Sequence, residues 1–314
     1  MIVFLARRIV HSIPVLLAVL VLSFLIIRLA PGDPVTIMLG IHATPAAVAA
    51  AKRNLGLDRS LGHQLAVYLA HSFEGNFGDS IVKQASVRSI VSNRIAPSLY
   101  LIVYAVVLAL LLTFPLAVLS TVKRNRITDQ LIRVLGMTVF AMPSFWLGLM
   151  LGLLFGLELH VLPVSGYASD PIGLLRTLLL PALTLALFLA PMLIRTLRAS
   201  LVEAVGTEYV EAARARGLSE VRVLGLHAMR NSLIPLVTVL SINIGFLLSG
   251  TVVIENVFQV PGLGSLLVQS VLTRDYPVIQ ALVFVFGVMV IVTNLLADVA
   301  YWVADPRIRF RRAS

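Results

Sequence analysis

The sequence predicts an all-α integral membrane protein with six transmembrane helices and a short helical external segment between the first two spans. Hydrophobic residues make up 59% of the 314 residues and charged residues only 13%, and the mean hydropathy is +0.96. A soluble domain with this composition would expose large apolar patches to water. The chain contains no cysteine, so a disulfide framework and a cysteine-ligated metal site are both excluded.

Each of six apolar runs reaches the roughly 20 residues that a helix needs to cross a bilayer. The predicted spans cover residues 9–30, 98–121, 131–157, 174–198, 233–255 and 278–303. Arg7 and Arg8 precede the first run, as in a secretory signal peptide, but the run is too long for a signal core and RLAPGDP is a poor cleavage site. A signal peptide is therefore the weaker interpretation. We expect Pro143, Pro181 and Pro191 to bend the third and fourth spans.

The Lys and Arg residues between the spans predict that both termini are cytoplasmic. The short loops on one side carry few cations, with Arg176 beside one loop and Arg274 in the other. The opposite side carries clusters of cations within residues 123–133, 195–230 and 307–312. The net charge of +10 is therefore mainly a topology signal and does not indicate nucleic-acid binding.

Residues 31–97 form the predicted external helical insertion. Thr44 and Pro45 are expected to begin a helix that Gly56 ends, and a second helix is expected from Ser60 to Ser72. The sequence EGNFGDS that follows is rich in residues that favour turns. Its central residues are Gly75, Asn76, Phe77 and Gly78.

A charged segment, EYVEAARARGLSEV, lies between the fourth and fifth spans, within a predicted cytoplasmic loop at residues 199–232. Eight charged residues between positions 203 and 230 would cost on the order of 20 kcal/mol at the bilayer centre. The segment is therefore expected to stay outside the membrane.

The local pattern of this segment predicts a helix, a stop and a second helix. Thr207 is the expected N-cap of a helix that begins at Glu208. Gly217 is the expected left-handed residue after its end, followed by Leu218 as an apolar contact. Ser219 then caps a second helix that runs to about residue 230. A solvated connecting helix and a helix that docks on a partner are both compatible with this pattern, whereas a DNA-binding helix-turn-helix is disfavoured by membrane spans on both flanks.

The sequence EYVEAARARG resembles the EAA loop of ABC importer permeases. Glu211, Ala212, Ala213 and Gly217 match that pattern at its spacing. The general continuation Ile-x-Leu-Pro is absent at residues 227–230, and LHAMRNSLIP instead resembles the variant in dipeptide and oligopeptide importer permeases. Further landmarks of that family occur in order along the chain. They are RRIVHSIPVLL, RLAPGDP, GNFGDS, MPSFWLGL, LPVSGY, LLPALTLAL, NVFQVPGLGSLL, RDYPVIQ and DPRIRF.

The resemblance covers the whole chain and implies a single permease domain over residues 1–314 with the type I importer fold, most similar to the B-type member of a heteromeric pair. Its implied partners are a second permease subunit, two cytoplasmic ATPase domains, an extracytoplasmic binding protein and a peptide substrate, in a bacterial cytoplasmic membrane. ATP and Mg would bind the ATPase subunits, because the chain has no GxxxxGK[ST] phosphate loop and is not expected to be an enzyme. The residues implied to contact the ATPase are Glu208, Tyr209, Glu211, Ala212, Ala213, Arg216 and Gly217.

Other candidate residues have two interpretations each. Ser241, Asn243 and Asn294 are polar residues at membrane depth, which can bond neighbouring helices or line the substrate path. Pro261, Gly262 and Gly264 form either a simple turn or an outer gate, and the turn at residues 75–78 either packs as a lid or contacts the binding protein. Nickel or haem is an alternative cargo. An ion-coupled carrier is the alternative class, although no acidic residue occupies an evident midplane position.

Overall fold

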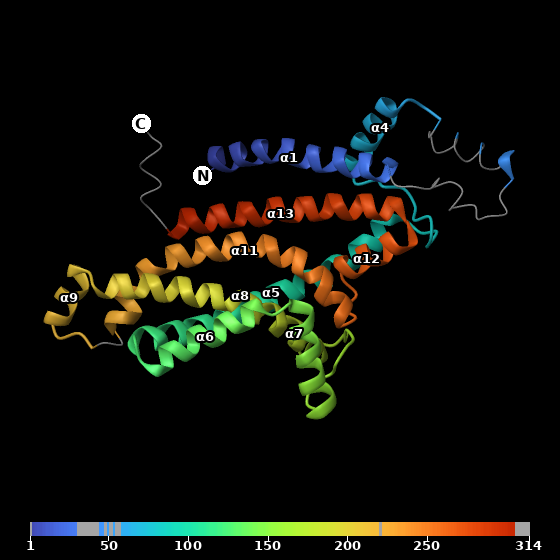
Figure 1. Cartoon of the computed structure of the whole chain (residues 1–314). Helices are drawn as coiled ribbons and strands as arrows, with labels where there is room; N and C mark the ends of the chain where they lie inside the picture. The colour runs from blue at the N-terminus through green and yellow to red at the C-terminus, as the bar shows by residue number, and fades with distance from the viewer. Residues whose placement is uncertain are drawn as a thin grey trace. The chain divides into compact units, whose positions relative to one another are not determined.

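A computed structural model describes residues 2–29, 44–46, 49, 53, 58–219 and 222–304. The described residues are helical apart from turns and one isolated bridge between Asp79 and Ser86 (Figure 1). The helices are α1 (Ile2–Leu29), α4 (Leu61–Glu74), α5 (Val87–Val122), α6 (Ile127–Ala141), α7 (Ser144–Leu151), η1 (Gly152–Glu158), α8 (Pro171–Val205), α9 (Glu208–Ala215), η2 (Val223–Ala228), α11 (Met229–Val257), α12 (Leu263–Thr273) and α13 (Tyr276–Ala304).

Five described helices, α1, α5, α8, α11 and α13, are long and apolar enough to cross a membrane. They contain the second, fourth, fifth and sixth predicted spans and the first as far as residue 29, which confirms these as helices. The helix predicted from residue 60 is also confirmed, because the Ser60 side chain accepts a bond from the backbone N–H of His63 at the start of α4. Gly75 ends α4 in a left-handed conformation with φ of 69°. The helix predicted between residues 44 and 56 lies largely outside the described residues.

The third predicted span is not one straight helix. The pair of α6 and the α7–η1 segment is bent by 106°, and the two parts make a sixth candidate span only when taken together. Met142 at the break is extended, with φ of −78° and ψ of 140°. A residue before proline is pushed out of the helical region, so Pro143 explains why the helix stops here. Figure 1 shows α7 turning away from α6.

The second predicted loop helix and the fifth predicted span are parts of one continuous helix. The described helix runs from Arg222 through η2 into α11 without a break, and Pro235 lies inside it. No glycine or proline lies between residues 226 and 234 to end the helix. The charged loop is therefore joined directly to a membrane-spanning helix.

The chain divides into two compact units. The first, residues 1–97 and 261–291, has a core in which the N-terminal parts of α5 and α13 pack with α12, through residues such as Val87, Leu263 and Leu282. The second unit contains residues 98–260 and 292–314. The assignment of residues 1–314 to one permease domain stays a prediction.

The core of the second unit is built around α8. Leu193, Leu197 and Leu201 on α8 are fully buried, and the alanines of α5, including Ala105 and Ala109, belong to the same cluster. α8 packs against both α6 and α11. About 61% of its most apolar stretch of 18 residues is buried, against 17–33% for the other long spans. α8 is therefore the helix on which the flanking elements of this unit are assembled.

Candidate functional site

The charged segment forms α9, a helix of eight residues from Glu208 to Ala215 that follows the end of α8. Thr207 occupies the predicted N-cap position, but its hydroxyl makes no cap bond. The hydroxyl instead donates to the Ala204 carbonyl at 2.5 Å. That carbonyl is one of the last in α8, where such groups lack helical partners. The predicted cap position is confirmed and the predicted cap bond is wrong. Glu208 and Glu211 in the first turn suit the positive end of the helix.

The C-terminal end of α9 has the predicted left-handed stop. Gly217 has φ of +79°, and its N–H donates to the Arg214 carbonyl at 2.9 Å. The Leu218 N–H donates to the Ala213 carbonyl at 3.3 Å. This pair of bonds is the Schellman motif, in which an apolar contact closes the end of the helix. Leu218 provides that contact, since it packs on a buried cluster of Val210, Ala213 and Val223.

α9 has an apolar buried side and a polar exposed side. Val210 and Ala213 are buried against the rest of the chain, whereas Glu211, Ala212 and Arg216 are exposed. Ala213 packs in a small cluster with Val210 and Val223, and Ala212 lies on the exposed side; contact of both alanines with a partner stays a prediction. The difference follows from helical geometry, because adjacent residues point about 100° apart around the axis.

A side-chain hydrogen bond joins α9 to the beginning of α11. The Asn231 Nδ2 atom donates to the Tyr209 hydroxyl at 2.9 Å, although 42% of Tyr209 is exposed. Figure 1 shows α9 beside the adjoining ends of α8 and α11. The segment is thus attached to two membrane-spanning helices.

Two of the three polar residues predicted at membrane depth, Ser241 and Asn243, bond to carbonyls of their own helix. Ser241 Oγ donates to the Val237 carbonyl at 2.7 Å. Asn243 Nδ2 lies 2.7 Å from the Val239 carbonyl and 3.2 Å from the sulfur of Met192 on α8. Asn294 is exposed on α13. Of the three, Asn243 reaches a neighbouring helix.

The predicted outer turn belongs to the first unit and is anchored there. Gly75 and Gly78 have φ of 69° and 71°, and the Asn76 side chain accepts the Gly78 N–H at 3.2 Å. Phe77 packs on the core of this unit, and its ring contacts that of Phe284 at a centroid distance of 5.6 Å and an interplanar angle of 50°. Asn76 and Gly78 are exposed.

Asp275 holds the chain just beyond this turn. Its buried carboxylate accepts the Ser80 hydroxyl and, at 3.2 Å, the Ile81 N–H. In the same unit, Gly262 is the N-cap residue of α12 and is buried together with Gly264, while Pro261 is half-buried. Burial of both glycines favours a packed turn over an exposed contact.

The sequence reasoning missed a buried ion pair in the second unit. The Asp129 side chain is 0% exposed and the Arg198 side chain 18%. Arg198 Nε and Nη2 lie 2.7 and 2.6 Å from the two carboxylate oxygens. Ser120 Oγ and the Asn125 N–H also donate to the carboxylate, at 2.5 and 3.0 Å. The signal in the sequence was a single aspartate among the cations of KRNRITDQLIR.

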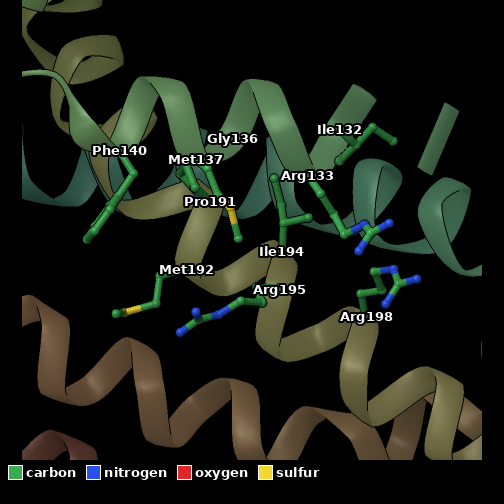
Figure 2. A pocket seen from close by; sticks show the side chains of 10 residues that line it. All are labelled: Ile132, Arg133, Gly136, Met137, Phe140, Pro191, Met192, Ile194, Arg195 and Arg198. Atoms are coloured by element: carbon green, nitrogen blue, oxygen red, sulfur yellow. The ribbon is translucent and has the colours of Figure 1, made fainter. Parts of the chain in front are cut away.

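A recess of about 120 Å³ lies between α6 and α8, close to this ion pair. Its apolar walls include Met137, Phe140 and Met192. Its charged lining residues are three arginines, at positions 133, 195 and 198. Figure 2 shows the Arg133 and Arg198 guanidinium groups near each other and the Arg195 side chain extending toward Met192. Sequence reasoning did not find this recess, because the lining residues come from two separate helices.

Comparison with known proteins gives consistent matches along the chain. Residues 109–310 match the family described as "Binding-protein-dependent transport system inner membrane component", and residues 1–101 match the N-terminal region of the same class of component. The glutathione transport system permease protein GsiC of Salmonella typhimurium is 39% identical over 305 residues, which cover 97% of this chain and 98% of the relative. GsiC of Escherichia coli K12 is 38% identical with the same coverage.

The fold is also similar to that of a solved transporter. A chain of the MetNI methionine ABC transporter in inward facing conformations superposes with a TM-score of 0.56. The match covers 69% of this chain and 96% of the MetNI chain at 16% sequence identity. This similarity shows the type I importer fold and does not bear on the cargo of this chain.

Proposed function

Since the chain belongs to the family of binding-protein-dependent transport system inner membrane components, and is a permease subunit of an ABC importer, we propose that it forms half of the translocation path for di- and oligopeptides. The name of the GsiC relatives supports a peptide cargo, because glutathione is a small peptide. We further infer a second permease subunit, two ATPase domains and an extracytoplasmic binding protein as its partners. The distribution of arginines supports an orientation with both termini cytoplasmic.

The observation that carries this proposal is the build of α9. Its apolar side is buried on the cluster of Val210, Ala213 and Val223, and its C-terminal end is closed by the Schellman bonds of Gly217 and Leu218. A short helix held in this way can transmit a displacement without unfolding. Its exposed side, with Glu208, Glu211, Ala212 and Arg216, offers charges and one small residue to a partner. We propose that this side docks in the cytoplasmic ATPase.

Movement of the docked ATPase would reach the spans through the two attachments of α9. One is the short connection from α8 through Gly206 and Thr207. The other is the Tyr209–Asn231 bond and the packing against Val223, at the beginning of the long helix that continues into α11. Because α8 and α11 make the most extensive helix contact in the second unit, a rigid displacement of α9 would move both together.

The test is co-purification of the complete importer in mild detergent with a tagged permease. We expect the wild-type chain to recover both a second permease subunit and an ATPase. Glu211→Lys should lose the ATPase and keep the second permease, because it reverses a charge on the exposed side of α9. Glu158→Lys, a charge reversal at an exposed glutamate outside α9, is the matched control and should behave like the wild type.

Two results would contradict the proposal. Equal ATPase recovery with Glu211→Lys and the wild type would exclude a docking role for this glutamate. Absence of any ATPase with the wild type, from membranes that contain it, would exclude the importer assembly.

A further inference from the structure

The recess between α6 and α8 contains one arginine that the buried ion pair does not use. Arg198 is held by two short bonds to Asp129, and Arg133 lies 3.6 Å from the same carboxylate. Arg195, one turn before Arg198 on α8, is exposed and forms no ion pair with another described residue. The recess is therefore positively charged, since one carboxylate lies beside three guanidinium groups.

Arg195 also lies on the most enclosed of the long spans. α8 packs against both α6 and α11, and the recess is lined by residues of α6 and α8. Met192 lines it and accepts a hydrogen bond from Asn243 on α11. Arg195 is one of the cations at the predicted cytoplasmic end of this span, so the recess would lie toward the cytoplasmic end of the proposed path.

We propose that Arg195 binds the carboxylate groups of anionic small peptides as they pass this recess. The inference rests on the import function proposed above and assigns a chemical preference to one point of the path. A guanidinium group presents parallel N–H donors that match a carboxylate. Met137 and Met192 are unbranched and polarisable, so they can adapt to peptides with different side chains.

The first test measures water access and charge at the recess directly, without any transport step. The chain contains no cysteine, so Met192→Cys introduces a single reporter thiol beside Arg195. Its reaction rate is measured in membranes with two thiosulfonate reagents, one bearing a sulfonate and one bearing a trimethylammonium group. The ratio of the anionic rate to the cationic rate is then compared between Arg195 and Arg195→Gln backgrounds.

We expect the anionic reagent to be favoured by Arg195, so that Arg195→Gln lowers the rate ratio about fivefold, as for an ion pair at a partly exposed site. The control is Ser219→Cys, at an exposed position outside the recess, whose ratio should not change. An unchanged ratio at the Met192→Cys thiol would overturn the proposal. So would a thiol that neither reagent reaches, because the recess would then be filled by protein or lipid.

The second test compares alanyl-glutamate with alanyl-glutamine, which differ by one carboxylate, in vesicles containing the complete importer. The binding protein is the same for both permeases, so its own selectivity cancels in the ratio of variant to wild-type uptake. Arg195→Gln should lower this ratio for alanyl-glutamate about fivefold more than for alanyl-glutamine. Arg195→Lys should restore most of the difference, and Arg195→Glu should reverse it.

Three outcomes would overturn the proposal. Equal losses for both dipeptides would make Arg195 a structural residue, and no loss would remove its role. A loss that followed the phosphatidylglycerol content of the vesicles would assign the recess to a lipid phosphate. Arg124→Gln, at an exposed turn outside the recess, is the matched control for general surface charge. Absence of uptake of any peptide by the wild type would instead count against the proposed function, while the thiol measurement would still decide the charge of the recess.

Discussion

Removal of the Asp129 charge should destabilise the second unit more than any change at a surface ion pair. In Asp129→Asn, the Arg198 guanidinium loses an anionic partner that it contacts at 2.6 and 2.7 Å. Breaking a fully buried pair costs about 3–5 kcal/mol. The side chain of Arg198 is 18% exposed and can recover some hydration, so we expect a loss of about 2–3 kcal/mol in the free energy of unfolding. This corresponds to a fall of about 5 °C in the unfolding temperature.

The assay is thermal unfolding of the purified chain in one detergent at a fixed heating rate, because irreversible unfolding depends on the rate of heating. Arg133→Gln is the matched control. Arg133 lies 3.6 Å from the same carboxylate, but its side chain is 47% exposed, and exposed pairs contribute about 1 kcal/mol or less. Equal shifts for Asp129→Asn and Arg133→Gln, or a shift below about 1 °C for Asp129→Asn, would refute the reasoning that burial makes this pair strong.

Three further changes have distinct expected results. Gly217→Val places a β-branched residue at φ of +79°, so less ATPase should co-purify with this variant, whereas Gly217→Asn should keep most of the ATPase. Equal recovery with both variants would show that the left-handed end of α9 is not needed for docking. Tyr209→Phe removes the exposed hydrogen bond from Asn231, and we expect the free energy of unfolding to change by less than about 1 kcal/mol. ATP hydrolysis stimulated by the binding protein should nevertheless fall. Unchanged stimulation would exclude this bond from the coupling between permease and ATPase. Asp275→Asn weakens the bonds to Ser80 and Ile81, so proteolysis within residues 79–86 should accelerate, and an unchanged cleavage rate would show that the turn is held by its apolar packing.

Features set by a few neighbouring residues could be predicted from the sequence. The five long spans follow from continuous apolar runs, and the start of α4 follows from a serine at its N-cap. The stop of α9 was predictable for the same reason: the left-handed Gly217 and the Leu218 contact involve residues less than ten positions apart. Such local preferences act before distant parts of the chain meet.

Other features were decided by how helices pack. The 106° bend follows from a proline whose local effect was foreseen, but the angle depends on the surroundings of both halves. Ala212 and Ala213 are adjacent and chemically identical, and only the rotation of α9 against Val223 decides which one is buried. Asp129 and Arg198 are 69 positions apart, and the recess beside them combines residues of α6 and α8. The sequence by itself therefore determined the membrane class, the five long spans and the ends of α9. The tertiary structure alone decided which charges meet and which face of each helix is available, because these depend on contacts between segments whose spacing in the sequence carries no periodic signal.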